Sequence, residues 1–393
     1  MSKKPEISII VPVYNVEPYV ARCLDSLIEQ TLRDIEIICV DDKSTDNSLS
    51  ILYEYAKKDK RIRVIALEKN SGVSTARNTG IDAAIGGYIS FVDPDDYVDI
   101  NFYERLYICA IQSGCDIVKG NTETTYFNGS QWDENDQLVE VQKFGKWHLH
   151  HPWIAVMCCT DMVNRHNLRF RVDMMYGEDE VFLAECVAVA NKVCVCLDVF
   201  YHYLRRENSL ATPILSPEKI TSELKSVNLI CDIYNNSDMA PNVYLSCYYY
   251  RWHKLIRFLF HQNTSLSCRK NVMENLISLY INCKNKSGLM KIYRQEYPDY
   301  AETVKYIQSH DVENLLKFFL SYEKEHTSGS LGTPSRKTRK ILLFSCLPVI
   351  KIINSPCTDT ISLFGVRLFK RKHSNKNTRI SILYIPILRV KQK

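Results

Sequence analysis

Residues 88–96 of the chain, YISFVDPDD, pass directly from a short apolar segment into three carboxylates. Residues 88–92 predict a buried strand, and Asp93, Asp95 and Asp96 follow at its end. Taken alone, such a cluster is usually a solvated turn, in which Asp96 or Asp99 caps the next helix. The segments that precede it in the chain decide between a turn and part of a site.

This strand is the fourth of a series in which short apolar segments alternate with amphipathic ones. The predicted strands are 7–13, 35–40, 62–66, 88–92 and 116–119. The predicted helices are 17–30, 44–55, 73–85 and 102–112. Such alternation indicates βαβ units, and therefore an α/β fold with a mostly parallel sheet and helices on both faces.

Polar residues follow each of the first four predicted strands where the strand ends. They are Pro12, Tyr14 and Asn15, then Asp41 and Asp42, then Asn70 and Ser71, and finally Asp93, Asp95 and Asp96. The carboxyl ends of parallel strands meet at one edge of a sheet, where ligands bind. We therefore expect these residues to line one cleft, and the acidic cluster to belong to it.

The acids limit what this cleft can hold. The chain has neither a G-x-G-x-x-G fingerprint nor a P-loop, and carboxylates repel a diphosphate unless a divalent cation lies between them. Mg²⁺ and Mn²⁺ prefer oxygen ligands. We predict Asp95 as the ligand, with Asp93 or Asp96 nearby, and a metal that acts as a Lewis acid on a departing diphosphate.

A second acidic cluster, GEDE at 177–180, opens a predicted helix that extends to about residue 190. Transfer to a hydroxyl requires a base, and the helix dipole is expected to keep these carboxylates ionised. Ordinary helix-start chemistry explains them equally well. Five other residues could bind a metal or phosphate, but we favour ordinary loop or strand-end positions for them: His148, His150, His151, His202 and Arg205.

Five motifs, in order, make residues 6 to about 210 resemble the inverting family 2 glycosyltransferases with the GT-A fold, of the bacterial surface-polysaccharide type. They are IIVPVYN at 9–15, VDDKSTD at 40–46, NSGVSTARNTG at 70–80, YISFVDPDD at 88–96 and GEDEVF at 177–182. Lys43 and Pro94 depart from the family pattern, but neither replaces a functional carboxylate.

The resemblance implies an enzyme that moves a sugar from a nucleotide-sugar donor, a UDP-sugar, to a hydroxyl of a glycan or lipid-linked acceptor. The context would be capsule, lipopolysaccharide or exopolysaccharide synthesis, with Mn²⁺ or Mg²⁺ as cofactor. The alternative is a non-catalytic relative that binds nucleotide or glycan. A nucleic-acid partner is disfavoured because the body of the chain is acidic and no nucleic-acid module is recognised.

Position by position, the resemblance also implies roles for single residues. The nucleotide-sugar-binding residues are Pro12, Tyr14, Asn15, Asp42, Arg77, Asp93 and Asp96. Among these, Pro12 and Tyr14 line the base and Asp42 bonds to a uracil-type ring. Arg77 faces the donor, and Asp93 contacts ribose or the donor sugar. Asp95 ligates the metal, and Asp179 is the catalytic base.

The alternation ends near residue 120. We expect loops at 120–175 with one helix near 153–166, a strand at 193–197, and helices at 217–325. The predicted domains are a GT-A domain at 1–215, a helical region at 216–327, a linker at 328–335 and a basic repeat tail at 336–393.

The tail contains three apolar hexamers that each close on or near a basic residue, spaced 19 residues apart, at 347–352, 366–371 and 385–390. It has 14 Lys and Arg and one acid, which gives +13, so the other 335 residues carry 5 − 13 = −8. Apolar residues alternating with basic ones suit an anionic membrane surface. We consider two interpretations of the tail. It makes peripheral contact with a membrane, or it is a small β-repeat module or a solvated tail.

The fifteen cysteines are scattered and form no C-x-x-C pair. In a chain of this length that pattern is typical of buried free thiols in a reducing compartment. The N-terminus lacks the apolar length of a signal peptide, and the longest apolar stretch, 341–350, is too short for a membrane span. We therefore expect a cytoplasmic protein, which would lie at the inner face of the cell membrane if the basic tail attaches there.

Overall fold

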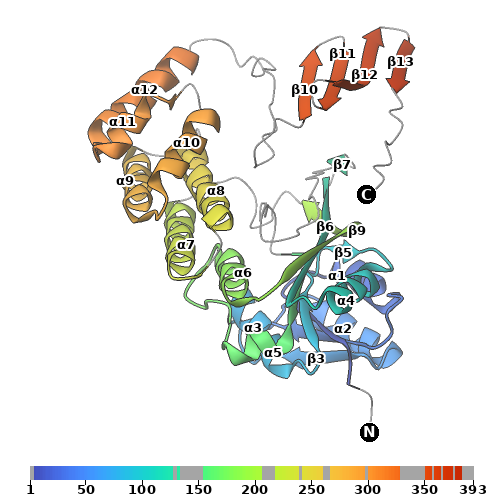
Figure 1. The fold of residues 1–393 in the computed structure, drawn as a ribbon. Coiled ribbons are helices and arrows are strands. Elements are labelled where there is room, and N and C mark those ends of the chain that lie inside the picture. Colours follow the sequence, from blue (N-terminus) through green and yellow to red (C-terminus); the bar gives the residue numbers. More distant parts are fainter. Residues whose placement is uncertain are drawn as a thin grey trace, which may run out of the picture. The chain divides into compact units, whose positions relative to one another are not determined.

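The computed structural model describes residues 4–126, 131–132, 154–205, 217–238, 241–259, 266–296, 300–327, 350–355, 358–363, 366–374 and 377–382 (Figure 1). Contacts divide the chain into two units, Met1–Phe319 and Leu320–Lys393, and each is described by itself. The boundaries of the four predicted domains stay a prediction.

A nine-stranded mixed sheet forms the centre of the first unit, in the order β3-β2-β1-β4-β8-β6-β9-β5, with β7 paired to β6. Its strands are β1 Ile7–Val13, β2 Ile35–Asp41, β3 Ile62–Ala66, β4 Tyr88–Phe91, β5 Tyr97–Val98, β6 Ile117–Tyr126, β7 Gln131–Trp132, β8 Val156–Cys159 and β9 Val193–Arg205. The first four are parallel, as predicted, whereas β8 runs antiparallel to both β4 and β6.

Helices alternate with these strands: α1 Val20–Ile28, α2 Ser48–Lys58, α3 Val73–Ala83, α4 Phe102–Ser113, α5 Thr160–Arg165 and α6 Glu178–Val189. Every residue of β1 and β2 is buried, as expected for central parallel strands covered on both faces. Helix α3 approaches the sheet most closely at Gly80, where an added Cβ would lie 2.4 Å from Ile10 Cγ2.

Two sequence predictions fail where the sheet becomes mixed. The helix expected near 153–166 is wrong, because β8 occupies its first half and only the short α5 follows. A short apolar run fits a buried strand as well as a buried helix, and pairing with β4 and β6 decides the matter. The strands expected at 116–119 and 193–197 are longer, since β6 and β9 pair over ten positions.

The helical region predicted at 217–325 is confirmed: α7 Pro217–Asn235, α8 Pro241–Leu259, α9 Leu266–Asn282, α10 Lys286–Glu296, α11 Thr303–Gln308 and α12 Val312–Thr327. Trp252 and Tyr248 are fully buried in its core, and the same core includes Val181 and Ala184 of α6. Helix α6 therefore packs against the helical region as well as the sheet. None of the described helices combines the length and hydropathy that crossing a membrane requires.

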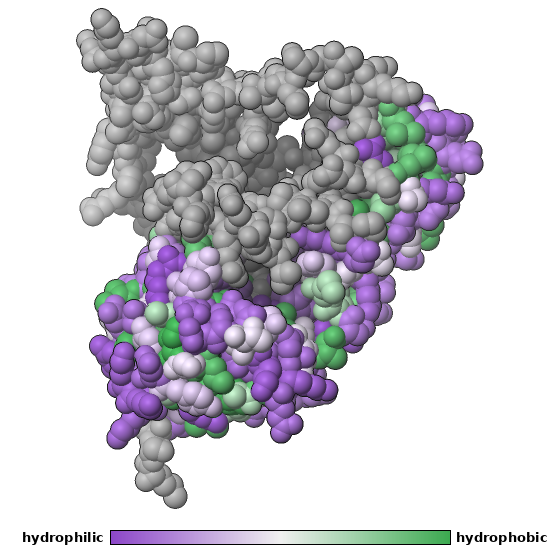
Figure 2. All heavy atoms as spheres, turned by 180° about the vertical axis from the view of Figure 1, so that it is seen from behind, coloured by the Kyte–Doolittle hydropathy of each residue, from purple (hydrophilic) through white to green (hydrophobic). Residues whose placement is uncertain are grey.

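Figure 2 shows one face of the chain by hydropathy. On the described residues hydrophilic side chains predominate, and hydrophobic ones occur in small separate groups. Such scattered groups are normal for a protein surface and do not by themselves mark a binding site.

The second unit contains an antiparallel sheet of β10 Ile350–Ser355, β11 Thr358–Leu363, β12 Val366–Ser374 and β13 Asn377–Ile382, in that order. The hexamer at 366–371 lies in β12, and the one at 347–352 is described only from residue 350. The third, at 385–390, lies outside the described residues. Hexamer residues thus lie in two of the described strands, β10 and β12, and both the β-repeat interpretation and membrane contact stay predictions.

Most described cysteines carry free thiols, as expected, but one pair does not. Cys115, just before β6, forms a disulfide with Cys194 of β9, with the Cα atoms 6.2 Å apart. The prediction of free thiols is therefore wrong for these two residues. Their spacing of 79 positions gave no signal, because strand pairing alone brings them together.

Candidate active site

The ends of the parallel strands meet as the sequence predicts. Val13 at the end of β1 pairs with Asp41, which pairs in turn with Ala66 at the end of β3. Strand β4 runs beside β1, with Phe91 opposite Ile10. The polar residues that follow these strands therefore lie along one edge of the sheet.

Residues at the end of β1 shape this edge. Pro12 is buried within the strand, whereas Tyr14 is 45% exposed. Asn15 has a φ of 51°, and its Oδ1 accepts a hydrogen bond from Thr45 N at 2.8 Å. The Asn15 side chain thus holds the loop after β2 in place, and its contact with a nucleotide stays a prediction.

Asp42 also organises a loop. Its two carboxylate oxygens accept hydrogen bonds from Ser71 N and Gly72 N, both at 2.7 Å, and so tie the end of β2 to the start of α3. In its neighbour Asp41, Oδ2 accepts from Ser44 N at 3.1 Å. Asp41 Oδ1 is buried and has no hydrogen-bond partner within the described part of the chain. The bond from Asp42 to a uracil-type ring stays a prediction.

Asp96 is fully buried behind the edge. Its Oδ1 accepts from Leu204 N and its Oδ2 from the Tyr201 hydroxyl, each at 2.7 Å. Burial, and then the charges of Asp95 and Asp93, raise the pKa of Asp96 well above its ordinary value. These contacts make Asp96 an anchor for β9, and its role in binding a nucleotide-sugar stays a prediction.

The helix-cap interpretation of Asp96 and Asp99 is wrong. Helix α4 begins after Asn101, and no side chain among the described residues caps it. Asp99 instead accepts from Phe200 N at 2.8 Å, and its other oxygen lies 2.8 Å from His202 Nε2. Both acids hold β9, and His202 of this strand is a hydrogen-bond partner of Asp99.

Asp93 and Asp95 remain half-buried at the edge itself. The Asp93 backbone N donates to the Tyr201 hydroxyl at 3.0 Å. The Asp95 carbonyl accepts from Arg22 Nη2 at 2.9 Å, and the Arg22 guanidinium lies 4.7 Å from the centre of the Tyr97 ring. The backbone of the acidic cluster is thus fixed from two sides.

Arg77 joins this cluster to the second one. The guanidinium donates through Nη2 to Asp93 Oδ1 at 3.1 Å and through Nη1 to Glu178 Oε1 at 3.0 Å. Its side chain is 5% exposed and lies over the Phe170 ring at 5.2 Å. One buried cation therefore holds two acids that are 85 positions apart (178 − 93). The sequence shows Glu178 in the second acidic cluster, but no spacing signal marks its contact with Arg77.

The three acids at the start of α6 have different proton affinities. Burial, together with the charges of Glu178 and Glu180, raises the pKa of Asp179 from 3.8 to about 8. Burial also raises the pKa of Glu178. It would do the same for Glu180, but Lys254 and Arg251 lower the pKa of that residue to about 2. The expectation that the helix dipole keeps all three ionised is wrong for Asp179, since burial outweighs it.

Asp179 is therefore poised for acid–base chemistry. Its Oδ1 accepts from Glu180 N at 2.7 Å, which fixes the carboxyl on the first turn of α6. A general base works best with a pKa near the operating pH. Of the predicted site residues, the structure thus ties Arg77 and Asp93 to the turn that carries Asp179.

Comparisons with known proteins show which family the sequence matches. Residues 8–169 match the sequence model of the family Glycosyl transferase family 2. The uncharacterized glycosyltransferase EpsJ of Bacillus subtilis is 37% identical over 247 residues, which are 60% of this chain and 72% of EpsJ. The poly(ribitol-phosphate) beta-glucosyltransferase of Bacillus spizizenii is 34% identical over 230 residues, 56% of this chain, and the match spans only 36% of that relative.

A solved structure shares the fold. TarS 1–349 of S. aureus in complex with UDP-GlcNAc matches with a TM-score of 0.66 at 19% identity, over 97% of this chain and 100% of that one. The predicted α/β fold of the GT-A type, followed by helices, is confirmed. On its motifs, its fold and its relatives, the chain belongs to glycosyltransferase family 2 and is a glycosyltransferase.

Proposed function

We propose that this enzyme transfers a sugar, with inversion, from a UDP-sugar to a hydroxyl of a glycan or lipid-linked acceptor in cell-surface polysaccharide synthesis. The observation that carries the proposal is the Arg77 bridge, which joins Asp93 at the strand edge to Glu178 beside Asp179. Donor and base would then work in one site, although the two acids lie far apart in the sequence.

Two relatives support the donor and the pathway. TarS 1–349 of S. aureus was solved with UDP-GlcNAc, and it shares the fold of this chain. The Bacillus spizizenii relative is named as a transferase that acts on poly(ribitol-phosphate). A nucleotide-sugar donor and a surface-polymer acceptor are therefore the substrates that we propose.

The donor would lie along the strand edge. Exposed Tyr14 and buried Pro12 would line the base, with Asp42 at the ring and Asp93 at the ribose or sugar. Arg77 holds Asp93 Oδ1 in a fixed place, which orients the carboxylate before substrate arrives. Such preorganisation keeps the reacting groups close to their productive geometry.

This edge can supply one or two carboxylate ligands to a divalent cation. Among the described residues, no group of three or more His, Cys, Asp and Glu side chains is arranged to hold a metal. Mg²⁺ in nucleotide sites is commonly bound by one or two carboxylates, with phosphate oxygens and water as the other ligands. Asp95 is the ligand that we propose, with Asp93 nearby, and the bound Mn²⁺ or Mg²⁺ would neutralise charge on the departing diphosphate.

The transfer moves one proton to a base and replaces one bond at the anomeric carbon of the sugar. Asp179 takes the proton from the acceptor hydroxyl as the hydroxyl oxygen forms a bond to the anomeric carbon of the sugar. The bond from that carbon to the diphosphate oxygen breaks on the opposite face, and the electron pair leaves with UDP. The ionised form of a carboxyl with a pKa near 8, whose fraction grows as pH rises toward 8, accepts a proton more readily than an ordinary Asp does.

The place of the enzyme in the cell is part of the proposal. We expect it in the cytoplasm, at the inner face of the membrane where lipid-linked acceptors are assembled. The basic composition of residues 336–393 supports attachment, at about 1 kcal/mol for each Lys or Arg near anionic lipid.

A panel of UDP-sugars with Mn²⁺ tests the proposal. We expect one donor to be turned over by the wild type, and Asp95→Ala to lose at least tenfold in kcat/KM. Asp161→Ala, which alters an exposed carboxylate on α5, serves as the control and should match the wild type. Donor binding without turnover by any sugar would favour the non-catalytic alternative and defeat the proposal.

A further inference from the structure

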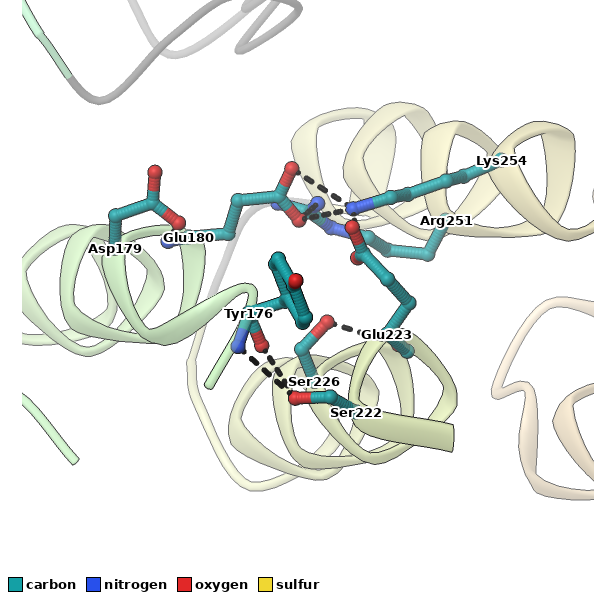
Figure 3. A network of polar contacts seen from close by, with 8 residues as sticks. All are labelled: Tyr176, Asp179, Glu180, Ser222, Glu223, Ser226, Arg251 and Lys254. Carbon is teal, nitrogen blue, oxygen red and sulfur yellow. Dashed lines mark hydrogen bonds and ion pairs between the residues drawn. The ribbon is translucent and has the colours of Figure 1, made fainter. Parts of the chain in front are cut away.

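A buried network of ion pairs joins the first turn of α6 to the helical region (Figure 3). Glu180 accepts hydrogen bonds from Arg251 Nη1 at 2.5 Å and from Lys254 Nζ at 2.9 and 3.0 Å. Lys254 also lies 2.5 Å from Glu223 Oε2 of α7. The Arg251 side chain is 5% exposed and that of Lys254 is 17% exposed. The Glu180 side chain is 26% exposed, so the pairs are partly shielded from solvent, and loss of one partner leaves a charge that is only partly hydrated.

Helix α7 holds the loop that leads into α6. Tyr176 N donates to Ser222 Oγ at 3.1 Å, and the same hydroxyl donates back to the Tyr176 carbonyl at 2.9 Å. Gly177 has a φ of 77°, and a Cβ added there would lie 2.7 Å from Ser226 Cβ. The helical region therefore fixes the chain on both sides of Asp179, through Gly177 before it and Glu180 after it.

Asp179 lies in the sequence between two acids that are bound by cations from different helices. Arg77 of α3 binds Glu178, whereas Arg251 and Lys254 of α8 bind Glu180. Figure 3 shows contacts from Glu180 to both Arg251 and Lys254, and none between these two cations and Asp179. The charged groups around this turn are Glu178 and Glu180 of α6, Arg77 of α3, Asp93 after β4, Glu223 of α7, and Arg251 and Lys254 of α8.

This arrangement links the helical region to the charge at Asp179. While both cations are present, the negative charge of Glu180 is balanced. Removal of one cation makes the surroundings more negative, which favours the protonated form of a neighbouring carboxyl. Removal of the Glu180 charge has the opposite effect. Loss of a cation should therefore raise the pKa of Asp179, and loss of the Glu180 charge should lower it, although both changes break the same ion pair.

We propose that Arg251 and Lys254 are positioning residues for the catalytic base, which act through Glu180 on Asp179. The inference rests on the proposed function, in which Asp179 is that base. It assigns a task to helices whose sequence contains no recognised motif. They hold the first turn of α6 and set the electrostatic surroundings of its carboxyl, so they form part of the catalytic unit.

The pH dependence of kcat/KM for sugar transfer tests this. We expect Lys254→Met to move the acidic limb up by about one pH unit, which is about a tenfold loss at a pH below the limb. Glu180→Gln should move the limb down. Lys254→Arg should restore the wild-type profile. Lys225→Met is the matched control, because Lys225 is an exposed lysine of α7 that pairs with Asp173, and it should not move the limb.

Folding is checked for each variant by thermal unfolding. Lys254→Met retains the pair between Arg251 and Glu180, and Glu180→Gln leaves an amide oxygen to accept hydrogen bonds. An unmoved limb in either folded variant, or shifts in the same direction, would overturn the inference. So would a higher KM for the acceptor with the limb unmoved, because Lys254 would then contact the acceptor directly. Absence of turnover by the wild type with every donor would instead overturn the proposed function.

Discussion

Replacing the proposed base should make the protein more stable while it abolishes activity. Asp179 has its pKa raised from 3.8 to about 8 by burial and by the charges of Glu178 and Glu180. Between these two pH values the folded chain binds a proton that the unfolded chain has released. The free energy of unfolding therefore falls as pH rises from about 4 to about 8. Asp179→Asn removes this penalty, and its Oδ1 still accepts from Glu180 N.

The size of the gain follows from the pKa values. Each pH unit above 3.8 lowers the free energy of unfolding of the wild type by about 1.4 kcal/mol, until the folded carboxyl ionises near pH 8. The variant should thus gain about 2 kcal/mol at pH 5 and about 4 kcal/mol at pH 7, as an order of magnitude. At roughly 2 °C per kcal/mol for a unit of this size, Tm should rise by about 4 °C at pH 5 and about 8 °C at pH 7.

Thermal unfolding at pH 5, 6 and 7 measures this gain, alongside sugar transfer by the same preparations. Activity should fall by about 10²–10⁴-fold, as expected for loss of a general base. Asp161→Asn controls for removal of an exposed carboxylate and should change stability by no more than about 0.5 kcal/mol. A Tm equal to or below that of the wild type, or a gain that shrinks as pH rises, would refute the reasoning.

Three further predictions concern the surrounding framework. Asp96→Ala removes the acceptor for Leu204 N and the Tyr201 hydroxyl and should destabilise the fold by about 2–4 kcal/mol, measured by chemical denaturation; a change below 0.5 kcal/mol would contradict its anchoring role. Arg77→Lys cannot reproduce the two-armed bridge, so kcat should fall at least tenfold while the fold is retained, and unchanged kcat would count against the bridge. Deletion of 336–393 should lower recovery in the membrane fraction without loss of transfer to a soluble acceptor; unchanged recovery would exclude attachment through the tail.

The parallel half of the fold is predictable because its strands are buried on both faces. Runs such as 7–13 and 35–41 are predominantly apolar, and the polar residues at their ends mark the edge where ligands bind. The carboxylates of the edge are therefore visible in the sequence. Strand β8 is not, because its buried run could equally form a helix until its neighbours β4 and β6 are known.

The connections between the site residues could not be predicted. The position of Glu178 is seen in the sequence, but its contact with Arg77 depends on how α6 packs against α3. Likewise, the sequence presents Asp96 as a free carboxylate in a turn, whereas β9 returns to cover it. The cations that hold Glu180 lie on α8, more than 70 positions away, in helices without a recognised motif. Such contacts depend on tertiary packing, which local spacing does not encode.

The central claim is that Asp179 performs the chemistry at an edge that binds the donor independently of it. Binding of UDP-sugar by calorimetry, together with single-turnover transfer, tests this directly in wild type and Asp179→Asn. For Asp179→Asn we expect a donor Kd within about twofold of the wild type and transfer slower by at least 10²-fold. Transfer at the wild-type rate by Asp179→Asn would contradict the claim.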